Sequence, residues 1–232
     1  MRRGLPFVFS NFAMTADGKI AFAHQHFTPF SSERDREHMM ELRAIADAVI
    51  CGATTVDVTG TILGNGGDHY RRQRLKNGLA EFPLRVIASG SGSIDPAGNI
   101  FKKRFSPVII LTSERIPSKR LKALRAVADA VEVFGRDQID FPRACRWLRK
   151  RWKVRRLLCE GGGELHNAMV RADVMDELHL TICPTVFGGR KAPTIAEGDN
   201  LERLADAKAF RLATFQRLGD EVFTVWRRRR RI

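Results

Sequence analysis

Short apolar runs alternate with amphipathic segments along most of this chain. Continuous apolar runs of strand length occupy residues 6–13, 48–51, 84–88, 108–111, 131–134 and 156–159. Runs without polar alternation are typical of strands buried on both faces, as in a parallel sheet. We therefore expect these segments to form the interior of one sheet.

Amphipathic segments between these runs predict helices. Ser32 followed by Glu33 is typical of a helix N-terminus, because the serine caps the first amides and the carboxylate suits the positive end. Pro117 fits the first turn of a second helix, and Trp147 and Leu148 would face the core from a third. The further predicted helices are residues 117–128, 141–152 and 164–171. Strands alternating with helices predict an α/β fold with three α/β/α layers and a mostly parallel central sheet.

The end of the chain has a different pattern. Residues 177–186 alternate between apolar and polar side chains, as in a strand. Residues 210–218 and 222–226 flank Gly219 and Asp220, which is typical of a β-hairpin. The sheet should therefore end in an antiparallel C-terminal edge.

Composition narrows the class of protein. Hydrophobic residues make up 44% of the chain and charged residues 28%, as in an ordinary folded domain. No apolar run approaches the roughly 18–20 residues that span a bilayer, and Asn11, Thr15 and Asp17 interrupt the first apolar stretch, so it is not a signal peptide. We expect a cytoplasmic protein without membrane contact, with one domain over residues 1–226 and a basic tail over 227–232.

The net charge of +14 indicates anionic partners without identifying them. A dinucleotide with a phosphorylated substrate would suit it, and so would nucleic acid. RNA binding would predict aromatic residues interleaved with the basic ones, yet Tyr70 is the single tyrosine. A non-enzymatic nucleic-acid-binding protein is therefore an alternative that the sequence does not favour.

Metal chemistry is not predicted. The four cysteines form no CxxC pair and the six histidines no HExxH motif, so neither a zinc site nor a disulfide framework is expected. We expect surface positions for all six histidines.

Glycine-containing turns follow two of the predicted strands. Gly52 opens the segment Gly-Ala-Thr-Thr, in which Thr54 and Thr55 offer hydroxyls, and Gly161 to Gly163 lie between a strand and a helix. Each turn alone could be a packing feature. Because ligands of parallel sheets bind beyond the carboxyl ends of the strands, two such turns together favour a cradle for a dinucleotide.

Three charged residues border these turns or the end of the first strand. Asp17 follows the first strand, and Glu160 lies between a buried strand and the triple glycine. A carboxylate in that position is unfavourable unless it is hydrogen-bonded. Arg43 interrupts an apolar helix segment, where it would either bind an anion or lie on an exposed face.

These motifs resemble a known family. The matching segments are residues 14–20 (MTADGKI), 42–44 (LRA), 46–56 (ADAVICGATTV), 158–165 (LCEGGGEL), 176–180 (DELHL) and 184–189 (PTVFGG). In this order they resemble the pyrimidine reductases of riboflavin biosynthesis, the reductase half of the bifunctional deaminase/reductase. The resemblance covers nearly the whole chain and implies a dihydrofolate-reductase-like fold.

The resemblance also implies a reaction. NADPH would reduce the ribosylamino side chain of 5-amino-6-(5-phosphoribosylamino)uracil, or of its diamino-pyrimidinone counterpart, to a ribitylamino side chain, and the enzyme would be a homodimer. NADPH-binding residues would be Ala13, Gly52, Thr54, Thr55, Ser89, Gly90, Gly161, Gly162 and Gly163, with Ser89 and Gly90 near the adenosine 2′-phosphate. Arg43, Leu63 and Glu160 would face the substrate, and Asp17 would be the catalytic acid at the polar end of the site.

Two departures from the family pattern limit this assignment. The HxE and PCxxC motifs of a zinc deaminase are absent, which predicts a stand-alone reductase. Residues 57–66 lack the family's Asp-Asp-Pro or Asp-Asn-Pro and the arginine that serves the substrate phosphate. The glycine-rich segment 59–80 is predicted as a long loop, and its Arg71, Arg72 or Arg74 could take the place of the missing arginine. Otherwise the substrate would lack that phosphate, or would be a different molecule such as another small carbonyl, imine or pterin.

Overall fold

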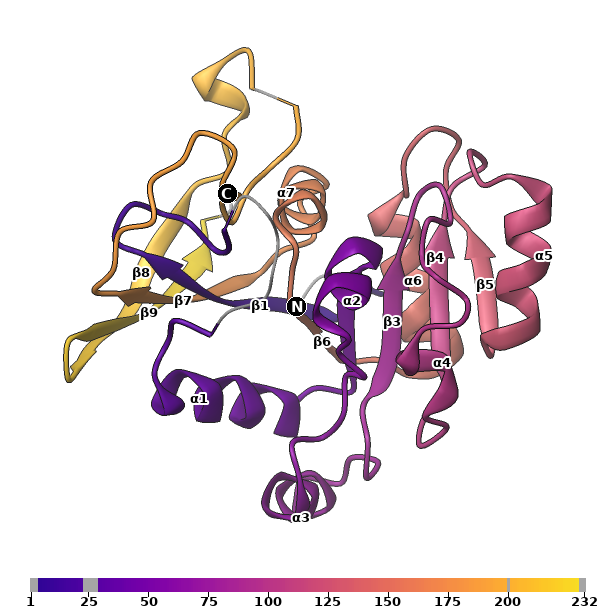
Figure 1. The fold of residues 1–232 in the computed structure, drawn as a ribbon, viewed down its shortest axis with the longest axis horizontal. Helices are drawn as coiled ribbons and strands as arrows, with labels where there is room; N and C mark the ends of the chain where they lie inside the picture. The colour runs from indigo at the N-terminus through magenta and orange to yellow at the C-terminus, as the bar shows by residue number, and fades with distance from the viewer. Residues whose placement is uncertain (1–3, 23–28, 200, 230–232) are drawn as a thin grey trace.

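The computed structural model describes residues 4–22, 29–199 and 201–229. Its core is a nine-stranded sheet with the strand order β5-β4-β3-β2-β6-β1-β7-β9-β8 (Figure 1). The strands are β1 (Phe7–Thr15), β2 (Ala48–Gly52), β3 (Leu84–Ala88), β4 (Val108–Thr112), β5 (Ala130–Val133), β6 (Arg156–Cys159), β7 (Glu177–Cys183), β8 (Phe210–Leu218) and β9 (Glu221–Arg228).

The sheet is parallel except at one edge. Every pairing from β5 across to β7 is parallel, whereas β9 is antiparallel to β7 and β8 is antiparallel to β9. The prediction of a mostly parallel sheet with an antiparallel C-terminal edge is therefore confirmed. Because β6 lies between β1 and β2, the carboxyl ends of these three strands lie side by side, where a parallel sheet binds its ligands.

Helices cover both faces of the sheet. They are α1 (Glu33–Ala44), α2 (Ala53–Thr59), α3 (Asp68–Lys76), α4 (Asn99–Lys102), α5 (Ser118–Val127), α6 (Phe141–Trp152) and α7 (Gly163–Arg171), with a short 3-10 helix at Leu204–Asp206. Successive residues such as Val8 and Phe9 belong to separate buried clusters, one packed under α6 and α7 and the other under α1 and α5. The three predicted layers are confirmed.

The helix N-termini largely follow the sequence signals. The Ser32 side chain accepts a hydrogen bond from the Asp35 amide, as an N-cap should. Pro117 is the N-cap of α5 rather than a residue of its first turn. Leu148 is fully buried, and Trp147 is only partly buried.

The prediction of one long loop over residues 59–80 is wrong. Helix α3 occupies the middle of this segment and lies beside α1 at the bottom of Figure 1. Fully buried Arg74 holds it there, because the guanidinium donates to the carbonyl oxygens of Ala80 (2.8 Å), Ala46 (2.7 Å) and Arg43. A helix attached through an arginine and backbone carbonyls has no apolar periodicity that could be recognised in the sequence.

Two expectations about the C-terminal strands also need correction. Strand β7 ends at Cys183 rather than at residue 186, and both of its faces are covered, since Thr181 is 1% exposed and His179 8%. Strand β9 extends to Arg228, so the basic block does not begin as a solvated tail at 227. The Arg227 side chain pairs with Glu177 and the Arg228 side chain with Asp173. No helix within residues 4–22, 29–199 and 201–229 is both long and apolar enough to cross a membrane.

Candidate functional site

The two glycine turns meet at the carboxyl ends of β2 and β6. The Gly52 amide donates to the Gly161 carbonyl oxygen (2.8 Å), and one residue earlier in the second turn the Glu160 amide donates to Ile50 (3.0 Å). Gly52 is the N-cap of α2 and Gly162 that of α7, and the peptide bond between Gly161 and Gly162 is cis. Two helix N-termini therefore begin at one point of the sheet edge, and their first amides have no partners within the helices.

Side chains cannot be added freely in this cradle. A Cβ on Gly163 would lie 2.3 Å from the Thr194 carbonyl oxygen, and one on Gly162 would lie 3.1 Å from Thr55 Oγ1. Gly161 has a φ of +101°, a conformation that side chains disfavour. The triple glycine is thus required by backbone geometry and close packing, and it leaves bare backbone facing Thr55.

Arg43 and Glu160 form a buried, two-pronged ion pair. Arg43 Nε lies 2.6 Å from Glu160 Oε1, and Nη2 lies 2.6 Å from Oε2, while Nη1 donates to the Gly64 carbonyl oxygen (2.9 Å). Both side chains are less than a tenth exposed, so Arg43 is not on an exposed helix face. Burial by itself lowers the pKa of Arg43, but Glu160 raises it overall. The two residues expected to face the substrate are therefore joined into one buried ion pair with no net charge.

Leu63 lies beside this pair through its neighbour Gly64. Its φ of +51° is uncommon for a residue with a branched side chain, and such backbone is often found where a segment is held for function. The Leu63 side chain is fully buried in the core. Only its backbone is therefore placed to face a ligand.

Asp17 fastens two loops together. Its carboxylate accepts from Thr15 Oγ1 (2.6 Å) and from the amides of Gly188 (2.8 Å) and Phe187 (3.2 Å). The Thr15 hydroxyl, and then these amides, lower the pKa of Asp17. A carboxyl held in its ionised form is a poor proton donor near neutral pH. The contacts of Asp17 join the turn after β1 to the loop after β7.

The other expected cofactor residues lie at neighbouring strand ends. The Ser89 hydroxyl accepts from the Ser93 amide (2.8 Å), and the Gly90 carbonyl accepts from Thr112 Oγ1 (3.0 Å), so both belong to a closed turn between β3 and β4. Thr54 is exposed at the start of α2, and half-buried Ala13 pairs with Thr181 across β1 and β7.

The candidate replacements for the missing phosphate-binding arginine differ in availability. Arg74 is excluded, because its guanidinium holds α3 in place. Arg71 pairs with Glu81, and Arg72 is exposed on α3. Helix α3 also joins the protein at Ala46, before β2 begins, and this is the opposite end of the strand from Gly52.

Residues 194–197, called the strap below, pack over the start of α7 and were not predicted from the sequence. Glu197 Oε1 accepts from the amide and hydroxyl of Thr194 (both 2.6 Å), and the Glu197 amide donates to the Gly163 carbonyl (3.3 Å). No motif marks this segment. Its Thr194 carbonyl is the group that leaves no space for a side chain at residue 163.

Buried histidines were also missed. His166 is 2% exposed, its Nδ1 lies 2.7 Å from the Ile195 carbonyl, and burial lowers its pKa to about 4. His38 and His179 contact each other beneath α1. The expectation of a surface position is therefore wrong for the buried His166 and His179, and His38 is only partly exposed. His69 is exposed as expected, and His24 and His26 lie outside the described residues. Among the described residues, no group of three His, Cys, Asp or Glu side chains is arranged to hold a metal ion.

Comparisons with known proteins agree with the fold and add a family. The model of the RibD C-terminal domain matches residues 6–224. A 2,5-diamino-6-ribosylamino-4(3H)-pyrimidinone 5′-phosphate reductase from Methanothermobacter thermautotrophicus is 30% identical, over 94% of this chain and 95% of that protein. A pyrimidine reductase-like protein of Corynebacterium diphtheriae has a similar structure (TM-score 0.81, 20% identity, 97% and 93% of the two chains).

A dihydrofolate reductase supports the expected fold class. The enzyme from Enterococcus faecalis, solved with NADP(H), aligns with a TM-score of 0.50 at 11% identity over 96% of both chains. At that identity the likeness concerns the fold alone, and it confirms the prediction of a dihydrofolate-reductase-like architecture.

Proposed function

The chain belongs to the RibD C-terminal domain family, and from this premise we propose that it is an NADPH-dependent reductase of riboflavin biosynthesis. It would reduce the ribosylamino side chain of a phosphoribosylamino-pyrimidine to ribitylamino. The observation that carries the proposal is the position of the buried Arg43–Glu160 pair directly beside the glycine cradle, at the carboxyl ends of adjacent strands. The glycine cradle on one side of this edge suits a dinucleotide. The Arg43–Glu160 pair on the other side presents fixed hydrogen-bonding groups to a polar ring.

The cradle fits NADPH by its lack of side chains. A pyrophosphate needs close approach to backbone amides. Gly162 and Gly163 leave this backbone bare, at positions where a Cβ would meet Thr55 or Thr194. Gly52, Thr54, Thr55 and residues 161–163 would hold the pyrophosphate, Ala13 would border the nicotinamide, and Ser89 with Gly90 would receive the adenosine end. When bound, the nicotinamide supplies the hydride, and the protein contributes binding and orientation.

The substrate side is built on Arg43 and Glu160. Because both Glu160 oxygens and two guanidinium nitrogens are used within the pair, the remaining Nη1 and the backbone of Leu63 and Gly64 are fixed in position. Groups that are fixed in this way can orient the substrate ring, and they need not move during the reaction. Asp17 would hold the loops after β1 and β7 around the sugar end. The name of the Methanothermobacter relative favours a diamino-pyrimidinone over another carbonyl, imine or pterin.

We also propose a cytoplasmic homodimer. Strand β8 is an edge strand with one β partner, β9, and its side chains are largely exposed, including Phe215 at 64% and Leu212 at 46%. Exposed apolar side chains on an unpaired edge are typical of a subunit interface. Sedimentation of the wild-type chain and of Phe215→Lys would test this assignment, since the variant should shift towards monomer.

An NADPH-oxidation assay tests the function. Purified protein would be given the diamino-pyrimidinone, its deaminated uracil counterpart, or dihydropterin, each with NADPH or NADH. We expect turnover with one of the two phosphoribosylamino compounds and a preference for NADPH. Gly162→Asp should abolish NADPH binding by placing a carboxylate in the cradle, whereas Gly219→Asp, in the open β8–β9 turn, should not. NADPH binding without turnover of either pyrimidine would refute the proposed reaction.

A further inference from the structure

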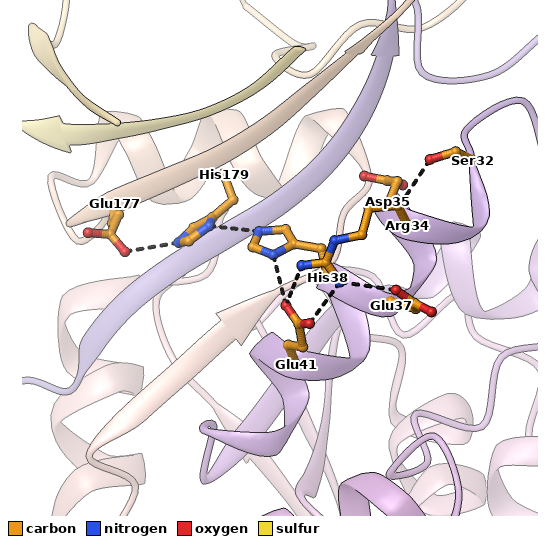
Figure 2. A network of polar contacts seen from close by, with 8 residues as sticks. All are labelled: Ser32, Arg34, Asp35, Glu37, His38, Glu41, Glu177 and His179. Carbon is orange, nitrogen blue, oxygen red and sulfur yellow. Dashed lines mark hydrogen bonds and ion pairs between the residues drawn. The ribbon is translucent and has the colours of Figure 1, made fainter. Parts of the chain in front are cut away.

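A line of polar contacts joins α1 to β7 (Figure 2). His38 Nε2 lies 3.1 Å from His179 Nδ1, and His179 Nε2 lies 2.9 Å from Glu177 Oε1. At the other end, His38 Nδ1 lies 3.5 Å from Glu41 Oε2. Two histidines from distant parts of the chain thus face each other between two carboxylates.

Arginines close both ends of this line. Arg227 on β9 donates to Glu177 Oε2 (2.7 Å), and Arg34 on α1 donates to both oxygens of Glu41 (2.8 and 3.1 Å). Burial raises the pKa of Glu177, but the hydrogen bonds from His179 and Arg227 lower it to about 2. The arginine similarly lowers the pKa of Glu41. Both carboxylates are therefore ionised and can only accept hydrogen bonds.

The proton count of the two rings follows from these acceptors. The Glu177 carboxylate, 2.9 Å away, places a proton on His179 Nε2. The 3.1 Å contact between the inner nitrogens also needs one proton, because two bare nitrogens would repel each other and two N–H groups would clash. One N–H on each ring meets both needs when His38 Nε2 donates to His179 Nδ1. Burial, followed by the neighbouring His179, lowers the pKa of His38, which favours the neutral form of that ring.

Aromatic side chains pack against both rings of the pair, and one further acid acts on His38. Phe9 on β1 packs edge-on against His179, and Phe223 on β9 packs against His38. Asp35, on α1, is the remaining charged group that acts on His38, and it raises the pKa of His38 less than burial lowers it. A hydrogen bond between rings shielded from water is stronger than an exposed one.

Helix α1 depends on this contact because it buries few apolar side chains. Its buried residues are Asp35, Leu42, Arg43 and Ala44. Polar contacts attach it at three places: Ser32 to Glu221 on β9, His38 to His179 on β7, and Arg43 to Glu160 after β6. The middle contact therefore controls how firmly the helix that carries Arg43 is held against the sheet.

We propose that His38 and His179 share one proton and act as positioning residues that hold α1, and with it Arg43, in the substrate-binding arrangement. The consequence for catalysis rests on the proposed function. Loss of the bond between the two rings releases the middle of α1. Substrate binding then weakens while the glycine cradle is unaffected.

Two substitutions of His38 test the shared proton. In His38→Gln the new side chain keeps a donor to His179, whereas in His38→Met it keeps the volume and loses the bond. We expect His38→Met to raise the substrate KM about fivefold, the ratio given by the loss of one net hydrogen bond, with kcat little changed. His38→Gln should retain the wild-type KM. The control is His69→Gln, at an exposed histidine that bonds Gln73 on α3.

Two measurements do not depend on catalysis. Nitrogen NMR of 15N-histidine protein should show a coupling through the hydrogen bond between His38 Nε2 and His179 Nδ1, and hydrogen exchange of α1 amides should accelerate in His38→Met. Absence of that coupling together with unchanged exchange in His38→Met would overturn the proposal. If the protein fails to turn over either pyrimidine, these measurements still decide the proton-sharing pair, so the two failures are distinguishable.

Discussion

The amide of Gly52 donates a 2.8 Å hydrogen bond to the carbonyl oxygen of Gly161. These residues are far apart in the chain, and each ends a strand, so one bond joins the two turns from which α2 and α7 begin. The bond also fixes the distance between Thr55 and the bare backbone at Gly162. The cradle is thus a property of two adjacent strands rather than of one loop.

Substitution of Gly163 should be more damaging than substitution of Gly52. An alanine Cβ at 163 would lie 2.3 Å from the Thr194 carbonyl, whereas one at 52 would have its nearest contact at 3.6 Å. We expect Gly163→Ala to lower the free energy of unfolding by about 1–3 kcal/mol and Gly52→Ala to change it much less. Urea denaturation of the two variants compares them directly. Equal losses would mean that the strap at residues 194–197 moves freely.

The Arg43–Glu160 pair should behave as a coupled unit. Removing one partner leaves a buried charge unpaired, so Arg43→Met and Glu160→Gln should each cost about 3–5 kcal/mol of stability. The double variant should lose clearly less than the sum of the two. A double-mutant cycle by denaturation measures this coupling, and additive losses would contradict it. In variants that stay folded, NADPH affinity should persist while pyrimidine turnover is lost.

Asp17→Asn separates a positioning role from proton donation. The amide keeps one acceptor oxygen in place of two, so one of the bonds from Gly188 or Phe187 is lost. We expect kcat/KM to fall roughly fivefold, as for the loss of one net hydrogen bond, with the pH profile unchanged. Disappearance of one limb of the kcat profile in Asp17→Asn would instead identify Asp17 as the general acid.

His166 should make stability depend on pH. Its pKa is about 4 in the folded protein, below the ordinary value of about 6.5, so the unfolded chain binds the proton more readily. The stability contributed by neutral His166 is complete above about pH 6.5 and is lost as the pH falls towards about 4, by up to about 3 kcal/mol. The lowered pKa of His38 acts in the same direction. His166→Gln should flatten the dependence of stability on pH between these values, and His69→Gln should not.

The sequence by itself determined the layered fold and the cofactor half of the site. Continuous apolar runs, the Ser32 cap and the glycine turns are local signals, and parallel pairing brings turns such as Gly52 and Gly161 to one edge. These features can therefore be predicted from residues that are close together in the chain.

Only the tertiary structure decided which polar side chains meet. The segment 59–80 gave no sign of α3, because Arg74 holds it through carbonyl oxygens instead of an apolar stripe. Arg43 and Glu160 are 117 residues apart and His38 and His179 are 141 apart, so no spacing rule connects them. Burial then made each pairing necessary, since a charged or polar group removed from water needs a partner, and that partner is set by the packing of α1 on the sheet.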